Sequence, residues 1–106
     1  MNRLPRAKKP RIQSRATHVD GIRFASQKEA RYYVALKARQ QSGLVRYFLR
    51  QVPLHLPGNI RYVVDFVEFH RDGSVHYIDV KGHKTEVYKL KKRQVEALYP
   101  IEVEER

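Results

Sequence analysis

Two aspartates and a lysine are spaced in this sequence so that their side chains could form one site for a divalent cation. Asp65 lies inside an apolar run, and Asp79 precedes Lys81 by two positions in a second run. Side chains alternate along a strand, so Asp79 and Lys81 should lie on one face. An inward carboxylate in an apolar strand is rare without a partner, and two neighbouring carboxylates repel each other unless a cation lies between them. The spacing therefore predicts a divalent-cation site with an ammonium group beside it.

The turn at 71–73 decides whether the two aspartates meet. A two-residue loop would set Asp65 opposite Val80. A three-residue loop with Gly73 in the left-handed conformation pairs apolar residues with apolar residues, and it sets Asp65 opposite Asp79. We favour this second register because it matches side chains of like character across the two strands.

All the candidate ligands of the predicted cation site are oxygen atoms. Glu29 would enter it from a helix, and the carbonyl of Val80 could add a ligand. The chain has no Cys, and its five His residues lack ligand-like spacing, so the set suits Mg²⁺, with Mn²⁺ able to substitute, rather than zinc. Two structural alternatives stay open. Ser26 and Glu29 have the S-x-x-E spacing of a capping box, so Glu29 could serve only to cap the helix that follows Ser26. Lys81 could simply neutralise the charge of Asp79.

The elements that must position these residues follow from periodicity and turn signals. Asp20-Gly21 predicts a small hairpin, and Ser26 opens a helix that buries Glu29, Tyr33 and Leu36. The run from Ile60 is apolar on both faces, which is typical of a central strand. A helix before the last strand indicates a parallel crossover and hence a mixed sheet. The predicted strands are 17–19, 22–24, 44–49, 52–56, 60–69, 75–81 and 101–103, and the helices are 27–41 and 86–98, the latter with Val87, Leu90 and Leu98 buried.

Composition narrows the choice of partner. The chain has 106 residues, enough for one domain, with 22 Lys and Arg against 11 Asp and Glu and a net charge of +11. Such a charge favours nucleic acid, and no apolar run is long enough to span a membrane. Residues 1–16 are basic and contain two prolines, which predicts a flexible tail before a domain at 17–106. The lack of Cys fits a reducing cytoplasm.

A basic helix directly after the Asp79 motif predicts contacts with a phosphate backbone, although a solvated helix face is the competing interpretation. By its position alone, Gln51 could be an ordinary edge-strand residue. The predicted nucleic-acid-binding residues are Gln51, Lys84, Tyr88, Lys89, Lys91 and Lys92.

Asp65 with Asp79-Val80-Lys81 resembles the signature of the PD-(D/E)XK nuclease superfamily, with Val64 at its weak first position. The predicted order of elements, αβββαβ, is similar to the restriction-endonuclease-like core of that superfamily. Most of the chain also resembles a family of small phage and prophage proteins, in the segments DGIRFASQKEA, QVPLHL, VVDFVEF, IDVKG and HKTEVYKLKKRQVEAL.

The resemblance implies a Mg²⁺-dependent endonuclease acting on DNA, for which a junction resolvase of phage recombination or replication is one candidate. It implies a catalytic set of Glu29, Asp65, Asp79 and Lys81 and a bacterial cytoplasm as the compartment. It also implies that Gln51 lies near the metal or the phosphate. Related small nucleases often work as dimers, so a homodimer is an open expectation. Two rivals remain: a non-catalytic nucleic-acid-binding module with the same fold, and an assembly protein whose basic tail docks on an acidic partner.

Overall fold

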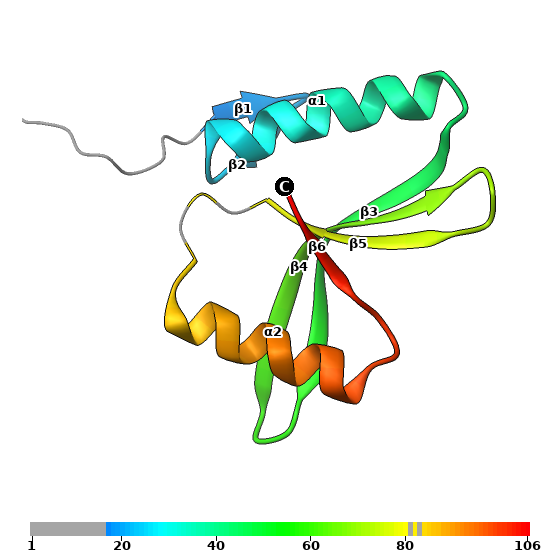
Figure 1. Cartoon of the computed structure of the whole chain (residues 1–106). Coiled ribbons are helices and arrows are strands. Elements are labelled where there is room, and N and C mark those ends of the chain that lie inside the picture. Colours follow the sequence, from blue (N-terminus) through cyan, green and yellow to red (C-terminus); the bar gives the residue numbers. More distant parts are fainter. Residues whose placement is uncertain (1–16, 81, 83) are drawn as a thin grey trace, which may run out of the picture.

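The computed structural model describes residues 17–80, 82 and 84–106 (Figure 1). The predicted tail at 1–16 and the candidate residue Lys81 lie outside the described residues. The described part is an α/β fold in which two helices pack on a mixed four-stranded sheet, beside a small two-stranded antiparallel sheet. Its elements are β1 (Thr17–Val19), β2 (Ile22–Phe24), α1 (Gln27–Gln41), β3 (Val45–Leu56), β4 (Ile60–His70), β5 (Val75–Asp79), α2 (Glu86–Leu98) and β6 (Val103–Glu105).

Helix α1 begins and ends as its sequence predicts. The Ser26 hydroxyl accepts a hydrogen bond from the Glu29 N–H at 3.1 Å, which satisfies one of the N–H groups that the first turn leaves unpaired. Beyond the other end, Gly43 has a φ of +87°, which glycine adopts without strain. Glu29, Tyr33 and Leu36 are all buried, so the predicted face is confirmed.

The sheet has the order β3-β4-β5-β6, which makes β4 and β5 its inner strands. Phe66 pairs with Ile78 in the antiparallel ladder of β4 and β5, and Gly73 in the intervening turn has a φ of +92°. This confirms the three-residue loop and the register derived from it. Strands β5 and β6 run parallel, as the intervening helix predicted.

Several strand boundaries differ from the prediction. The strand predicted at 75–81 ends at Asp79, because the Val80 N–H bonds the Asp65 carboxylate rather than a backbone carbonyl. The segments 44–49 and 52–56 belong to one long strand, β3, because pairing with β4 continues on both sides of Gln51. Gln51 itself has a φ of +52°, so a local irregularity replaces the predicted break. The last strand begins at Val103 rather than 101, because the Ile101 N–H still bonds the Tyr99 carbonyl at 2.8 Å in the turn around Pro100.

The core has two parts, one under each helix. Phe24, Leu36 and Phe66 belong to the cluster beneath α1, and Val64 and Val95 belong to the cluster beneath α2. Figure 1 shows α1 along one side of the sheet and α2 across the far half of β3 and β4. Residues between the two clusters therefore lie at the boundary between the part of the core under α1 and the part under α2.

The predicted buried face of α2 is wrong. Val87, Leu90 and Leu98 are 62%, 50% and 59% exposed, whereas Val95 is fully buried and Tyr88, two turns earlier, packs beside it. The physical reason is that amphipathic side chains cover the core with their apolar parts while keeping a polar tip in contact with water. A prediction based on aliphatic residues alone therefore chose the wrong side of the helix.

Helices α1 and α2 are both too short and too polar to cross a lipid bilayer, and this holds for the described residues.

Candidate functional site

The backbone ladder between β4 and β5 gives way to side-chain hydrogen bonds beyond the pair Phe66 and Ile78. Asp79 Oδ1 accepts from the Asp65 N–H at 3.1 Å, and Asp65 Oδ2 accepts from the Val80 N–H at 2.8 Å. Each aspartate thus replaces a backbone carbonyl of the opposite strand as the acceptor. The register brings the two carboxylates together at the end of the ladder.

Gln51 joins this pair of strands to helix α1. Its Nε2 donates to Glu29 Oε2 at 3.0 Å and to Asp65 Oδ1 at 3.2 Å. Glu29 and Asp65 are each only 7% exposed. Two carboxylates from different elements therefore converge on one amide nitrogen. The positive φ of Gln51 is an uncommon conformation for a residue with a side chain, and such outliers cluster at functional sites.

Asp79 is fully buried, and its second oxygen, Oδ2, accepts a hydrogen bond from the hydroxyl of Tyr62. Burial and this bond to Asp79 raise the pKa of Tyr62 far above its usual value, so the hydroxyl stays protonated and donates. The Tyr62 ring stacks on Tyr88 of α2 with centroids 6.1 Å apart. The sequence prediction did not include Tyr62. A tyrosine in a strand with two buried faces needs a partner for its hydroxyl, and that signal could have found it.

The donor set fits a hard divalent cation in chemistry. Glu29 and Asp65 offer carboxylate oxygens that already point at one shared position, and such oxygens are the preferred ligands of Mg²⁺. Among the described residues, no group of three or more His, Asp or Glu side chains is arranged to hold a metal ion. That shared position is filled by Nε2 of Gln51, whose amide would have to turn away before a cation could lie between the two carboxylates.

The protein family described as "Protein of unknown function (DUF1064)" matches residues 9–104. The chain belongs to this family. The matched range contains every predicted site residue, from Glu29 to Lys92. No curated protein and no solved structure matches the chain.

Three of the predicted nucleic-acid-binding residues of this DUF1064 chain meet at Glu105. Lys92 Nζ and the Tyr88 hydroxyl lie 3.1 Å from Glu105 Oε2, and Lys84 Nζ lies 3.4 Å from Oε1. The hydrogen bond from Lys92 is the largest influence that lowers the pKa of Glu105 below its usual value. Glu105 is the register partner of Asp79. This basic group therefore borders the strand that carries the carboxylate.

Of the two other predicted lysines, Lys89 is exposed and Lys91 is half-buried. Lys89 pairs with Glu86 at 3.4 Å, and Lys91 Nζ lies 3.5 Å from the Arg61 carbonyl oxygen. An open hollow of about 340 Å³ separates α2 from the start of β4. It is lined by Arg61, Tyr62, Val63, Thr85, Val87, Tyr88 and Lys91. Because Tyr62 bonds Asp79, its side chain links this hollow to the carboxylates.

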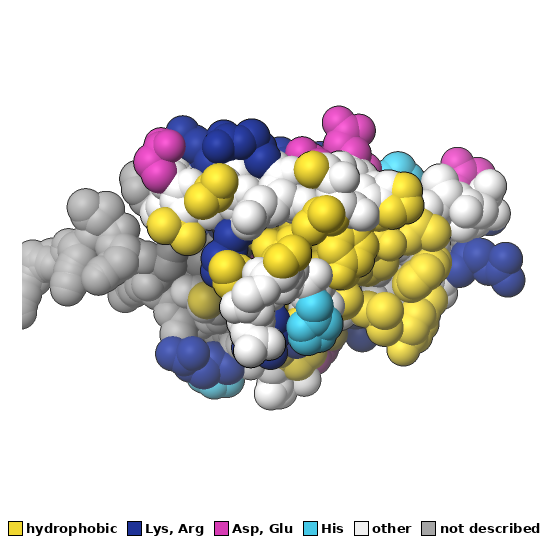
Figure 2. Space-filling view, turned by 90° about the horizontal axis from the view of Figure 1, so that it is seen from below, with side chains coloured by type: hydrophobic (Ala, Val, Ile, Leu, Met, Phe, Trp, Pro, Cys, Tyr) yellow, Lys and Arg dark blue, Asp and Glu magenta, His cyan; other side chains and the backbone are white. Residues whose placement is uncertain are grey.

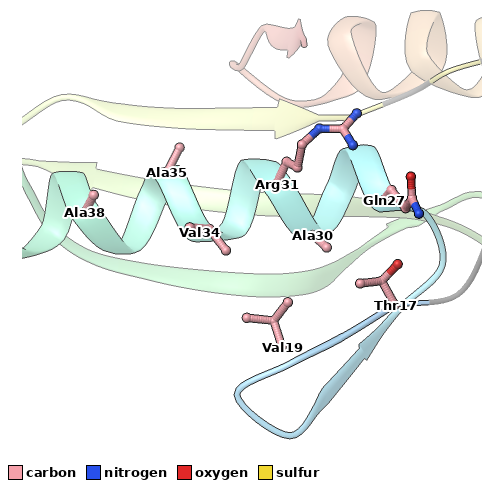
Figure 3. A pocket seen from close by; sticks show the side chains of 8 residues that line it. All are labelled: Thr17, Val19, Gln27, Ala30, Arg31, Val34, Ala35 and Ala38. Atoms are coloured by element: carbon pink, nitrogen blue, oxygen red, sulfur yellow. The ribbon is translucent and has the colours of Figure 1, made fainter.

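A larger hollow of the DUF1064 chain, about 580 Å³, lies elsewhere. It runs along one side of α1, with Val19 and Thr17 of β1 as the opposite wall, and Figure 3 shows Ala30 and Val34 pointing toward that wall. None of the predicted site residues lines it. The hollow has an apolar lining of small side chains and is separate from the carboxylate site.

Proposed function

We propose that this chain is a metal-dependent endonuclease that hydrolyses phosphodiester bonds in DNA. The observation that carries the proposal is the convergence of Glu29 and Asp65 on Gln51, next to the hydrogen-bonded pair of Asp65 and Asp79. Buried carboxylates are rare in protein interiors unless they are paired or bind a cation, and three of them gather in this corner.

The order of elements supports the same proposal. A helix with a buried glutamate precedes three antiparallel strands, and a second helix then leads to a parallel strand. This is the αβββαβ order of the PD-(D/E)XK nucleases that the sequence resembles. We propose a restriction-endonuclease-like core on that ground, and a phage or prophage origin on the resemblance of the sequence segments.

In the proposed reaction, Glu29 and Asp65 hold the cation, and the Val80 carbonyl is a further candidate ligand. The sequence also predicts Asp79 as a ligand, but both of its oxygens accept hydrogen bonds from protein donors, so we assign it a positioning role. A bound Mg²⁺ would supply a Lewis acid for the scissile phosphate and a water of lowered pKa. Asp79 keeps Asp65 in position through the Asp65 N–H, and Tyr62 fixes Asp79. Lysine has a usual pKa of about 10.4, so Lys81 is assigned to stabilising charge on the phosphate rather than to proton abstraction.

The basic residues around α2 would hold the DNA backbone. Lys91 and Arg61 border the hollow beside Tyr62, and the charge of +11 attracts phosphate polyanions without reading base sequence. These contacts position a strand near Asp79. Preference among duplex, nicked and branched DNA would depend on how many such backbones the protein can engage at once.

A non-catalytic nucleic-acid-binding module is the second candidate. The observation that favours it is that both oxygens of Asp79 already accept hydrogen bonds from protein donors, Asp65 N–H and Tyr62. In that case the aspartates would close the end of the strand ladder and nothing more. This candidate predicts salt-sensitive binding of DNA without cleavage.

The test is cleavage of a labelled DNA panel that includes plain duplex and four-way junctions, with Mg²⁺ or with a chelator. Asp65→Asn keeps the shape of the side chain and removes its charge, and Glu86→Gln makes the same change on a 92% exposed carboxylate. We expect Mg²⁺-dependent cutting by the wild type and by Glu86→Gln, and a loss of about a hundredfold or more in Asp65→Asn. Equal metal-dependent cutting by Asp65→Asn, or binding without cutting by the wild type, would contradict the proposal.

A further inference from the structure

One face of the β3–β4–β5 region carries apolar and aromatic side chains from three adjacent strands. Tyr47 pairs with Phe69, and Phe69 pairs with Val75, so these three side chains form one row across the sheet. The neighbouring row is offset by two positions along each strand and therefore lies on the same face. We call this surface the apolar sheet face; it comprises Tyr47, Leu49, Val67, Phe69, Val75 and Tyr77.

The outer part of the apolar sheet face is open to water. Tyr47 is 58% exposed, Val75 43%, Leu49 40% and Phe69 36%. Its inner part, including Val67, belongs to the core cluster beneath α2. Figure 2 shows a continuous hydrophobic area on this side of the molecule, toward the end that holds the β4–β5 turn. The four exposed side chains present roughly 300 Å² of apolar surface in one contiguous patch rather than as single scattered residues.

Charge decides what can cover this face. The chain carries +11, yet none of the six positions is Lys, Arg, Asp or Glu. Nucleic acid and anionic lipid surfaces are bound through Lys and Arg, and the face offers neither. Two copies of a strongly basic chain repel each other over most approaches, and an uncharged face lets them meet with the least repulsion. Aromatic residues such as Tyr47 and Phe69 are also enriched in protein interfaces.

We propose that the apolar sheet face is the interface of a homodimer, in which two copies pair about a two-fold axis. A two-fold axis presents the same patch from both subunits, so a self-complementary apolar surface needs no second kind of partner. A standard interface covers about 800 Å² per subunit with an apolar centre and a polar rim. The exposed apolar area here is the right size for such a centre. The proposal is independent of any catalytic activity.

The groove along α1 is the competing apolar surface. Val34 is 52% exposed there, and the groove is long. However, Arg31 lines this groove (Figure 3). Lys28 lies on the same helix. Pairing two copies through α1 would bring these cations together, whereas pairing through the sheet face would not.

The test is the mass of the full chain by sedimentation velocity across a range of concentrations. We expect the wild type to reach twice the chain mass of 12.6 kDa. Phe69→Arg should weaken the dimer by about tenfold or more, because it places a charge in the centre of the interface. Val34→Arg adds the same charge to α1 and should leave the dimer unchanged. Circular dichroism and thermal unfolding establish that each variant is folded.

Val75→Arg is a second variant at the rim of the same row, and it replaces Phe69→Arg if that protein does not fold. Three outcomes would overturn the proposal. The first is a wild type that stays monomeric at the highest concentration. The second is a dimer that survives a folded Phe69→Arg or Val75→Arg variant. The third is a dimer that Val34→Arg dissociates, since this would place the interface on α1.

Discussion

At the scale of single residues, Gln51 holds the candidate site together. Its amide donates to carboxylates from α1 and β4, and its backbone adopts a left-handed conformation within a strand. Such a conformation costs about 1 kcal/mol or more in a residue other than glycine, so the surrounding contacts must compensate for it. The two hydrogen bonds from the Gln51 amide to Glu29 and Asp65 are the clearest source of this compensating energy.

This geometry predicts the effect of Gln51→Glu. A third carboxylate beside Glu29 and Asp65 should repel both, and the variant should lose about 1–3 kcal/mol of unfolding free energy at neutral pH. Added Mg²⁺ should restore more stability to the variant than to the wild type, because the cation neutralises the extra charge. Thermal unfolding with and without Mg²⁺ measures both effects.

Gln94→Glu makes the same change at an exposed position of α2 and should alter the unfolding free energy by less than about 0.5 kcal/mol. A Gln51→Glu protein as stable as Gln94→Glu would show that Gln51 does not lie between two carboxylates.

At the scale of elements, a second buried carboxylate fastens α1 to β4. Glu68 is 1% exposed and bonds Tyr32 at 2.5 Å, Arg39 at 3.2 Å and His70 at 2.9 Å. Burial acts to raise the pKa of Glu68, but the hydrogen bonds from Tyr32, His70 and Arg39 outweigh it and lower the pKa below the usual 4.5. Burial and the bond to Glu68 raise the pKa of Tyr32 to about 12.

The lowered pKa of Glu68 gives a signed pH dependence. Its contribution to stability is complete above pH 4.5 and is lost as the pH falls through the lower pKa of the folded state. Glu68→Gln should therefore lose about 1–3 kcal/mol of unfolding free energy at pH 7 and show a shallower acid loss below pH 4.5 than the wild type. Urea unfolding at several pH values tests this. Parallel curves for the two proteins would contradict it.

Helix α2 provides the third prediction. Val95 is fully buried and Leu90 is 50% exposed, although both are aliphatic. Val95→Ala should lower the unfolding free energy by about 1–3 kcal/mol through lost burial and a residual cavity, and Leu90→Ala by no more than about 0.5 kcal/mol. Urea unfolding compares them directly. A larger loss for Leu90→Ala would mean that the helix is turned as the sequence pattern suggested.

The contrast between the two helices shows how far sequence reasoning reaches. The face of α1 and the register of β4 and β5 followed from local rules: capping at Ser26, turn chemistry at Gly73 and strand alternation. The face of α2 did not, because Tyr88 rather than the aliphatic Leu90 packs on the core. Hydrophobicity alone does not distinguish an amphipathic side chain that covers a core from one that faces water.

The candidate site likewise contains contacts that the sequence could predict and contacts that it could not. The meeting of Asp65 and Asp79 could be predicted, because one hairpin register determines it. The contacts of Gln51 with Glu29 and of Tyr62 with Asp79 could not, since each joins residues 17 or more positions apart through side chains. Periodicity places a side chain on a face, but the conformation of that side chain depends on the packing of the whole domain.

At the scale of the whole molecule, the candidate site and the apolar sheet face involve different residues. Basic side chains border the carboxylate corner around Glu105 and Arg61, and the exposed residues of the apolar sheet face, Tyr47, Leu49, Phe69 and Val75, are uncharged. This division would let one surface face a phosphate backbone while the other faces a second subunit. The proposed cleavage of DNA depends on a carboxylate corner that binds cations rather than one that only closes a strand ladder, whereas the proposed dimer does not.

The most direct test of that corner needs no DNA. Mn²⁺ is paramagnetic, so titration followed by electron paramagnetic resonance separates bound from unbound ion. We predict saturable binding by the wild type and by Glu86→Gln, and at least about tenfold weaker binding by Asp65→Asn and Glu29→Gln. Absence of binding at millimolar Mn²⁺, or equal affinity in all four proteins, would contradict the account.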